Sequence, residues 1–272
     1  MVELAKGIFA RKLVRGVLAV VAVMGLAVFF LQEKLLFYPE KLPENYVFES
    51  KFPLEERWLE VDGTKIHTLY FRGKEASGLI LYFHGNAGNL ASWGGVGEEL
   101  VERTGWDVWM VDYPGYGKSG GMITSEDQLH DIALALYSAG NATGHTKIAA
   151  MGRSIGSGLA LKLASQMPLQ GLVLETPYYS LARLAKEKFP WVPGFLLRYP
   201  IRSYEWMPKV TAPVLFLHGR EDEIIPYAHS EDLLKLAPEG KAKLVTFERG
   251  RHNDLSSHEP YWQAVAEFFK SL

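Results

Sequence analysis

The sequence predicts an α/β fold with a mostly parallel central sheet and helices on both of its faces. Residues 78–83 and 107–111 are continuous apolar runs, as expected of strands that are buried on both faces. Helical patterns alternate with such runs along the chain, which favours parallel strands joined by crossover helices. The chain has 272 residues, enough for one sizeable domain.

The N-terminal stretch stands apart from this alternation, because residues 16–31 are uncharged and almost wholly apolar. A helix over residues 13–31 would rise about 28 Å, close to the roughly 30 Å hydrocarbon core of a bilayer. Four basic residues precede the uncharged stretch 16–31: Lys6, Arg11, Lys12 and Arg15. The positive-inside rule then predicts a cytoplasmic N-terminus and a domain outside the cytoplasm, in the periplasm, at the cell surface or in an organelle lumen.

We therefore expect residues 1–32 to form a cytoplasmic stub and a single transmembrane helix that attaches the protein to the membrane. Residues 33–53 carry three prolines and scattered aromatic residues, which is typical of a tether. A cleaved signal peptide is an alternative for the apolar stretch, although the bulky residues 29–32 do not provide its small-residue cleavage site. A buried core helix is the other alternative.

Composition excludes several classes of function. The formal net charge of −2 gives no indication of a nucleic-acid partner. The chain has no cysteine, which excludes disulfides, thiolate metal sites and a cysteine nucleophile. No separate cluster of histidines and carboxylates stands at metal-ligand spacing, so no metal and no cofactor are expected. Nothing indicates an obligate protein partner.

Residues 54–272 are expected to form the domain. Alternating residues at 57–61 and 65–72 flank Asp62-Gly63, which predicts a hairpin. Beyond residues 78–83 and 107–111, further strands are expected at 148–151, 169–175, 214–217 and 243–247. Helices are expected to end near residues 103 and 166 and to cover 125–137, 230–236 and 260–272. The stretch 176–212, dense in aromatic residues and prolines, interrupts the alternation.

The turn after the 148–151 strand reads Gly-Arg-Ser-Ile-Gly at residues 152–156. A sharp turn from strand to helix lifts its central serine above the sheet edge, and it needs small residues two positions to either side. The pattern predicts Ser154 as a nucleophile. Ser119 fits the same pattern, but it lies in a loop that opens no helix, and we expect it to be a loop serine.

A serine nucleophile needs a base and a group that orients the base, both just beyond the carboxyl ends of strands. His252 follows the 243–247 strand and meets this demand, and His258 is the alternative base. The loop after the 214–217 strand offers three candidate acids: Glu221, Asp222 and Glu223. The residues alone leave this choice open.

Five stretches together resemble the α/β-hydrolase superfamily, and within it the membrane-anchored, Bem46-like serine hydrolases. They are Phe-His-Gly-Asn-Ala-Gly-Asn (83–89), Asp-Tyr-Pro-Gly-Tyr-Gly-Lys-Ser (112–119), Gly-Arg-Ser-Ile-Gly-Ser (152–157), His-Gly-Arg-Glu-Asp-Glu-Ile-Ile-Pro (218–226) and Arg-His-Asn-Asp (251–254). The resemblance runs from about residue 35 to the end of the chain. It implies an α/β-hydrolase fold with a triad of Ser154, Asp222 and His252, in the superfamily's order.

The resemblance also implies an oxyanion hole, formed by the backbone N–H groups of Asn86 and Ile155. Residues 176–212 occupy the position of the superfamily's lid, where aromatic side chains would line an acyl pocket, face the membrane or form the lid's own core. Arg251 stands where the family usually has a small residue, and it would narrow the pocket or contact an anionic group. Arg153 has no role that the sequence indicates.

The predicted activity is hydrolysis of a carboxylic ester or thioester through an acyl-enzyme on Ser154, with a small-molecule or lipid acyl ester as substrate. A serine peptidase or amidase using the same triad is one alternative, and a non-catalytic membrane scaffold is another. Residues 115–120 formally match a dinucleotide-binding pattern, but no helix opens from these glycines. Asp112 also occupies the first glycine position of a P-loop, so nucleotide binding is not expected.

Overall fold

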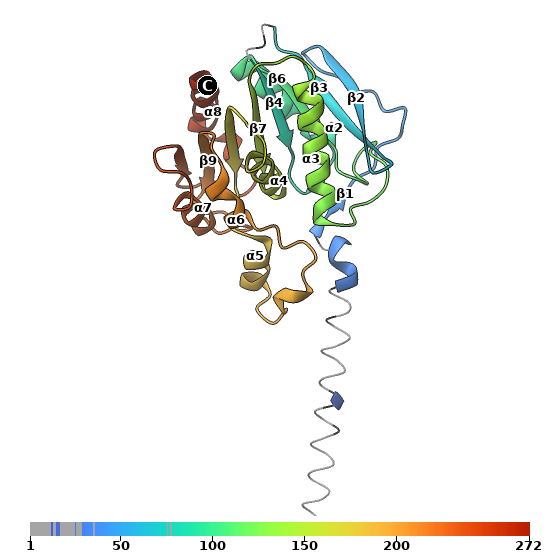
Figure 1. Cartoon of the computed structure of the whole chain (residues 1–272), viewed down its shortest axis with the longest axis vertical. Coiled ribbons are helices and arrows are strands. Elements are labelled where there is room, and N and C mark those ends of the chain that lie inside the picture. The colour runs from blue at the N-terminus through green and yellow to red at the C-terminus, as the bar shows by residue number, and fades with distance from the viewer. Residues whose placement is uncertain are drawn as a thin grey trace, which may run out of the picture.

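An eight-stranded sheet runs through the middle of the domain in the order β10-β9-β8-β7-β4-β6-β3-β2 (Figure 1). The computed structural model describes residues 29–34, 36–74, 76 and 78–272, and the single positions 12, 15, 16 and 25. The strands are β2 (Leu54–Val61), β3 (Thr64–Phe71), β4 (Leu79–Phe83), β6 (Asp107–Val111), β7 (Ile148–Arg153), β8 (Gly171–Glu175), β9 (Val214–Gly219) and β10 (Ala242–Phe247). The run from β6 to β10 is parallel, which confirms the predicted sheet.

The predicted hairpin joins the two antiparallel strands β2 and β3, which form the edge of the sheet opposite β10. Its turn pairs Val61 with Thr64, and the two residues between them have positive φ angles of 48° at Asp62 and 70° at Gly63. Two successive positive φ angles match the right-handed twist of the strands, which is why Asp-Gly is favoured at such turns.

Helices cover both faces of the sheet. On one face lie α3 (Glu126–Asn141) and α4 (Ile155–Ala164), and on the other lie α2 (Leu90–Thr104) and α8 (Glu259–Ser271). Alternate residues of β4 divide between the two hydrophobic cores, with Leu81 and Phe83 on the α4 side and Ile80 and Tyr82 on the α2 side. A strand buried in this way on both faces gives the continuous apolar run seen in the sequence.

The first turns of two of these helices are capped by side chains that the sequence places there. The side chain of Asn89 accepts a hydrogen bond from the backbone N–H of Ala91, and Ser92 completes a capping box at the start of α2. The side chain of Ser125 caps α3 by accepting from the N–H of Gln128. The last connecting helix, α7 (Ala228–Leu234), begins and ends two residues before the predicted 230–236.

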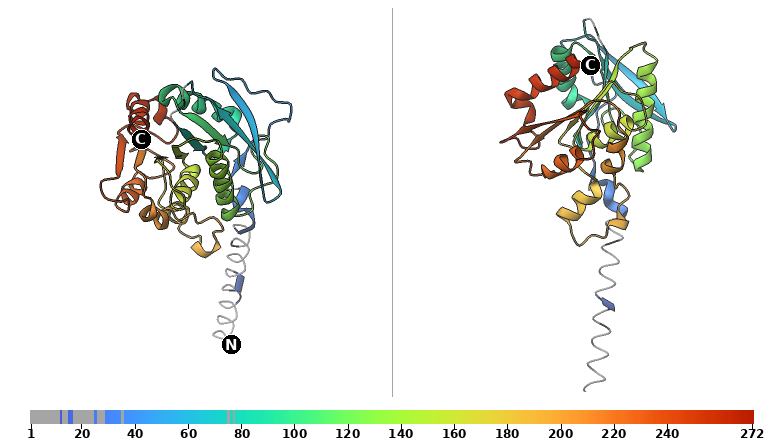
Figure 2. Two further views of the ribbon diagram at one scale, coloured as in Figure 1. Left: turned by 45° about the horizontal axis from the view of Figure 1, so that its top comes forward. Right: turned by 60° about the vertical axis from the view of Figure 1, so that its left-hand side comes forward.

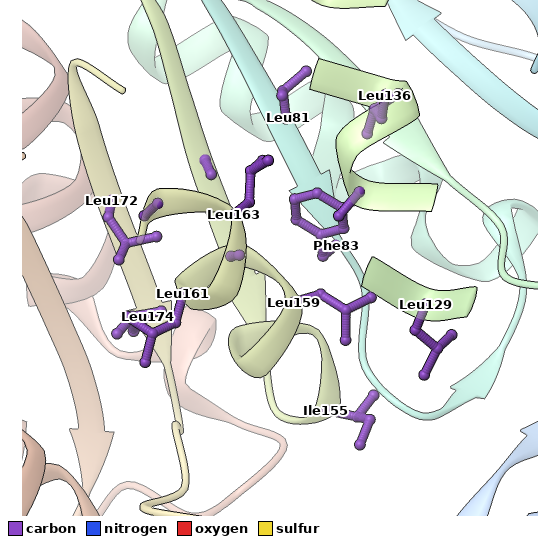
Figure 3. Packing of buried hydrophobic residues seen from close by; sticks show 14 of the residues in the cluster. Leu81, Phe83, Leu129, Leu136, Ile155, Leu159, Leu161, Leu163, Leu172 and Leu174 are labelled. Carbon is purple, nitrogen blue, oxygen red and sulfur yellow. The ribbon is translucent and has the colours of Figure 1, made fainter. Parts of the chain in front are cut away.

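Helix α4 is the most deeply placed helix, since nine of its ten residues are buried. Leu159, Leu161 and Leu163 pack among side chains of β4, β8 and α3 (Figure 3). A helix that is apolar on all sides is stable only where it is enclosed by other elements. The first turn of α4 is therefore held rigidly, and so is Ser154, which directly precedes it.

Residues 176–212, here called the lid segment after the prediction made for them, contain four short helices: α5 (Leu181–Lys188), η1 (Gly194–Leu196), α6 (Ser203–Trp206) and η2 (Met207–Lys209). The sequence did not predict these helices. The aromatic side chains of this segment differ widely in exposure, and Tyr179 and Tyr204 are partly buried and stack on each other. Tyr178, Tyr199 and Trp206 are buried and belong to the domain core, whereas Phe189, Trp191 and Phe195 are exposed.

Residues 29–34 are helical, and the chain then lies against the domain. Strand β1 (Tyr38–Pro39) pairs in parallel with β5 (Ala87–Gly88), next to the loop that follows β4. Most of the apolar stretch 16–31 lies outside the described residues. Among the residues that are described, no helix combines the length and the apolar character needed to cross a membrane. The transmembrane helix therefore remains a prediction.

Candidate active site

Ser154 lies at the junction of β7 and α4 in a strained conformation, with φ 51° and ψ −119°. The space around this turn is very small. A Cβ atom on Gly152 would lie 2.3 Å from the carbonyl oxygen of Gly156, and one on Gly156 would lie 2.2 Å from the carbonyl oxygen of Phe83. Only glycine fits at these two positions without backbone movement. The tight turn projects the half-buried Ser154 side chain above the end of β7.

The structure brings the three predicted triad residues together from the ends of three parallel strands. Ser154 Oγ lies 3.0 Å from His252 Nε2, and His252 Nδ1 lies 2.8 Å from Asp222 Oδ2. Because a carboxylate only accepts hydrogen bonds, the neutral form of this imidazole carries its proton on Nδ1. Nε2 is then free to accept the hydroxyl proton of Ser154.

The carboxylate of Asp222 is held in place by several donors. Its Oδ1 atom accepts hydrogen bonds from the backbone N–H groups of Ile224 at 2.9 Å and Ile225 at 2.7 Å. His218 Nε2 lies 3.2 Å from its Oδ2 atom. Burial alone would raise the pKa of Asp222, but His218, His252 and the N–H of Ile225 together hold that pKa well below its ordinary value. Asp222 is therefore ionised at neutral pH.

The alternative candidates for base, acid and nucleophile make other contacts. His258 pairs with Asp254 at 3.4 Å and lines a cavity of about 480 Å³ beside α8. Glu223 accepts a hydrogen bond from the backbone N–H of His252 at 3.4 Å, so its contact is with the main chain and not with the imidazole. Ser119 is buried, donates to the carbonyl oxygen of Asp112 at 2.9 Å and accepts from the N–H of His67 at 2.8 Å, as expected of a loop serine.

The loop after β4 lies beside the nucleophile, since a Cβ atom on Gly85 would be 3.9 Å from the Cβ atom of Ser154. Asn86 follows Gly85, and the Tyr116 hydroxyl donates to its carbonyl oxygen at 2.6 Å. Within the described part of the chain, no hydrogen bond engages the backbone N–H of Asn86. Ile155 is the first residue of α4, a position whose N–H has no partner inside the helix. Both N–H groups are thus suited to receive an oxygen atom near Ser154.

Asp112 contacts both ends of the loop that follows β4. It is fully buried, with His84 Nε2 at 3.3 Å and His67 Nδ1 at 3.8 Å from its carboxylate oxygens. It also accepts a hydrogen bond from the backbone N–H of Leu90 at 3.1 Å. Burial would raise the pKa of Asp112, but His67, His84 and the N–H of Leu90 hold it below its ordinary value. The charge of Asp112 therefore fixes the start of α2 and the residues around His84.

Arg153 links the nucleophile turn to the histidine loop, a role that sequence reasoning missed. Its Nη2 atom donates to the carbonyl oxygen of His252 at 3.2 Å and to Asn253 Oδ1 at 3.0 Å. Its Nε atom lies 3.4 Å from the buried carboxylate of Glu175, which also accepts from the Tyr261 hydroxyl at 2.8 Å. These partners are distant in sequence, so the position of Arg153 next to Ser154 was the only signal available.

Arg251 lies on the same loop but is exposed, and it pairs with Glu223 at 3.4 Å. Its side chain therefore lies at the rim of the site, beside the loop that carries Asp222. These contacts test neither of the two roles that the sequence suggested for Arg251.

The sheet order and the serine, histidine and carboxylate at its carboxyl edge define an α/β hydrolase. Residues 78–207 match the family described as the alpha/beta hydrolase fold. The WAV2 protein of Arabidopsis thaliana, an alpha/beta hydrolase domain-containing protein, is 30% identical over 92% of this chain and 91% of its own. The bem46 protein of Schizosaccharomyces pombe is 27% identical over 91% of this chain and 89% of its own. The chain belongs to the α/β-hydrolase family and is Bem46-like.

Solved structures agree on the fold. The Pyrococcus furiosus esterase Pf2001 superposes with a TM-score of 0.72 at 17% identity, over 87% of this chain and 98% of that one. Est1E from Butyrivibrio proteoclasticus, solved with ferulic acid bound, gives a TM-score of 0.65 at 22% identity, over 79% of this chain and 96% of that one. The α/β-hydrolase fold expected from the sequence motifs is thereby confirmed.

Proposed function

We propose that this protein is a serine hydrolase that cleaves carboxylic ester or thioester bonds through an acyl-enzyme on Ser154. The observation that carries the proposal is the continuous chain of contacts from Ser154 Oγ to His252 at 3.0 Å and from His252 to Asp222 at 2.8 Å. A nucleophile, a base and a group that orients the base are the minimum set for this chemistry.

In the first half of the reaction, Ser154 Oγ attacks the substrate carbonyl carbon while His252 Nε2 takes the hydroxyl proton. The carbonyl oxygen becomes an oxyanion that accepts hydrogen bonds from the N–H groups of Asn86 and Ile155. The tetrahedral intermediate then collapses, and His252 gives its proton to the departing alcohol or thiol. Asp222 stabilises the imidazolium that exists between these two proton transfers.

In the second half, a water molecule attacks the acyl-enzyme carbonyl and gives one proton to His252 Nε2. The intermediate collapses, the acid product leaves and the proton returns to Ser154 Oγ. The same donors serve both halves because the oxyanion forms at the same place each time. The strained backbone of Ser154 supports this reuse, since it fixes the direction in which the side chain leaves the turn.

Esters and thioesters are favoured over amides as substrates. Two structural neighbours support this preference, because Pf2001 is named as an esterase and Est1E was solved with ferulic acid bound. The lid segment is short, and its uncharged stretch 189–197 suits an acyl chain better than a peptide. No feature of the described residues favours the peptidase, and the intact contacts of the triad argue against a non-catalytic scaffold.

The test uses a fluorophosphonate probe, which reacts with an activated serine. Wild-type protein should label, and S154A should not. S138A is the matched control, because Ser138 is an exposed serine on α3 whose hydroxyl bonds only to the carbonyl oxygen of Leu134 among the described residues. Equal labelling of wild type and S154A would overturn the proposal. If only wild type and S138A label, a panel of p-nitrophenyl esters and monoacylglycerols would define the acyl length.

We further propose that residues 13–31 anchor the protein in a membrane, with the hydrolase domain outside the cytoplasm. Support comes from the length of this stretch, from the apolar character of residues 16–31 and from the four basic residues before residue 16. A protease-protection assay on sealed membranes tests the orientation. Digestion of the domain from the non-cytoplasmic side is expected, and protection from that side would reverse the assignment.

A further inference from the structure

The part of the lid segment between α5 and Arg198 is unusual in composition. Residues 189–197, here called the lid tip, read Phe-Pro-Trp-Val-Pro-Gly-Phe-Leu-Leu and contain no charged or hydrogen-bonding side chain except the indole of Trp191. Three of its aromatic side chains are open to solvent: Phe189 is 53% exposed, Trp191 62% and Phe195 85%. Single exposed apolar residues are common, but a cluster on one short segment marks an interaction site.

Basic residues flank the lid tip on both sides. Lys186 and Lys188 precede it at the end of α5, and Arg198 and Arg202 follow it. An apolar segment bordered by lysine and arginine fits a phospholipid surface, where the apolar side chains enter the bilayer and the cations meet phosphate groups. The same pattern does not fit a soluble acidic partner, because the tip between the cations offers no polar group except the indole.

The lid tip is fastened to the segment that leads out of the proposed anchor. The side chain of Gln32 donates to the carbonyl oxygen of Leu196 at 2.7 Å and accepts from the backbone N–H of Arg198 at 2.8 Å. Glu33 forms an ion pair with Arg198 and accepts from the Tyr199 hydroxyl at 2.9 Å. Residues 29–34 and the part of the lid segment from α5 to η1 accordingly lie at the same end of the domain (Figures 1 and 2).

The contacts also order these residues by depth. Arg198 lies level with Glu33, whereas Leu196 reaches back to Gly25, where a Cβ atom would be 3.4 Å from Leu196 Cδ1. Gly25 belongs to the apolar stretch and comes eight residues before Glu33 in the sequence. The lid tip therefore lies beside apolar sequence, on the anchor side of the polar pair Glu33–Arg198.

We propose that the lid tip inserts into the surface of the phospholipid bilayer that holds the N-terminal anchor, with the Glu33–Arg198 pair at the headgroup level. The irregular backbone of the tip fits the interfacial region, because its polar groups would remain unpaired in the hydrocarbon core. The proposal rests on the membrane anchor proposed above and is independent of the catalytic assignment.

Insertion would place the bilayer next to the proposed active site. Lys188, the last residue of α5, donates to the carbonyl oxygen of Glu223 at 3.0 Å, and Glu223 directly follows Asp222. Glu187 lies 2.9 Å from His229 on α7, and Arg183 pairs with Asp232 at 2.6 Å, so α5 is fixed to the domain on the same side. A bilayer that contacts the lid tip is therefore one short helix away from the loop that carries the triad acid.

The test takes advantage of the absence of cysteine from the chain. Full-length F195C and W191C are labelled with the fluorophore NBD and reconstituted into phosphatidylcholine–phosphatidylglycerol vesicles that carry nitroxide-labelled lipids. A142C is the matched control, because Ala142 is exposed in the loop before β7. This loop lies at the amino ends of the strands, whereas the lid segment follows the carboxyl end of β8. Flotation of the vesicles in a density gradient reports membrane attachment separately.

We expect blue-shifted NBD emission at positions 195 and 191, with most of the fluorescence lost to the lipid nitroxides, and water-like, unquenched emission at position 142. Water-like emission at 195 and 191 in protein that floats would overturn the insertion and leave the anchor standing. A blue shift without quenching would mean burial within protein and would also overturn it. Protein that does not float would overturn the anchor and the insertion together.

Discussion

The guanidinium group of Arg153 donates a hydrogen bond to the backbone carbonyl oxygen of His252 at 3.2 Å. The residue next to the proposed nucleophile thus holds the loop that carries the proposed base. The same side chain faces the carboxylate of Glu175 at 3.4 Å and lies 5.0 Å from the ring centre of Trp93. Burial alone would lower the pKa of Arg153, but Glu175 raises it, so the charge is retained. Arg153 is accordingly a positioning residue.

Replacing Arg153 should loosen the histidine loop and also leave a charge unpaired. We expect R153A to lower kcat about ten- to hundredfold with a smaller change in KM, since hydrogen bonds to charged groups contribute about 1.5–3 kcal/mol. The buried Glu175 carboxylate loses its partner, which should reduce the free energy of unfolding by about 3–5 kcal/mol. R153K should restore part of kcat, a result that a purely structural role would not require. Steady-state kinetics and urea unfolding measure both effects.

Arg251 provides the control for that experiment, because it lies on the same loop but is exposed and pairs only with Glu223 among the described residues. R251A should change the free energy of unfolding by less than about 1 kcal/mol, as is usual for surface ion pairs. If R251A and R153A lowered kcat equally, a general effect of positive charge near the site would explain the result better than positioning of His252.

The choice between the two candidate bases leads to a second prediction. His252 lies 3.0 Å from Ser154 Oγ, whereas His258 pairs with Asp254 beside α8. H252A should therefore lose about 10³–10⁴ in kcat, whereas H258A should remain within a few fold of wild type. D222N should resemble H252A, because an amide that donates to Nδ1 reverses the tautomer of the imidazole. Near-normal ester turnover by H252A would transfer the role of base to another residue.

Strands and the nucleophile turn were predictable because their signals are local. The apolar run before Ser154 and the glycines around it lie within a few residues, and the Asp62-Gly63 turn requires no distant partner. The choice of Asp222 over Glu221 and Glu223 came from the resemblance to a family, since the residues alone left it open. The structure shows the contact that distinguishes it, which is the 2.8 Å distance from His252 Nδ1 to Asp222.

Other features depend on contacts that no local pattern encodes. Arg153 acquires its role from Glu175 and His252, and the lid tip acquires its position from Gln32, over 160 residues away in sequence. Helix α7 begins earlier than predicted because Tyr227 already has helical backbone angles and no capping side chain marks the start. Helix α5 did have a local signal, the Ser180 cap, but the prolines and aromatic residues after it concealed the helical pattern.

Stability at acid pH should depend on Asp112. Its pKa in the folded protein lies below the ordinary value, because His67, His84 and the N–H of Leu90 outweigh the effect of burial. The ionised side chain therefore stabilises the fold fully above its unfolded pKa of about 3.9, and this stabilisation is lost as the pH falls toward the folded pKa. D112N removes the titrating group and keeps the shape of the side chain.

The free energy of unfolding of wild type should consequently fall more steeply than that of D112N as the pH is lowered from about 5 to 2. Urea unfolding curves at a series of pH values measure both slopes, and their difference isolates Asp112 from the other carboxylates. Parallel slopes for the two proteins would mean that Asp112 has the same pKa in the folded and unfolded states.

The final prediction concerns two glycines in different surroundings. A Cβ atom on Gly156 would lie 2.2 Å from the backbone oxygen of Phe83, so G156A must displace α4 from β4. We expect G156A to lose probe labelling of Ser154 and to reduce the free energy of unfolding by about 1–3 kcal/mol, the usual cost of overpacking. Gly95 is also helical, in α2, but a Cβ atom there meets nothing within 4 Å, so G95A should label normally and gain about 0.5–1 kcal/mol. Unfolding curves and fluorophosphonate labelling of both variants test this prediction. Equal labelling and equal stability of G156A and G95A would show that the close approach of α4 to β4 does not constrain the nucleophile turn.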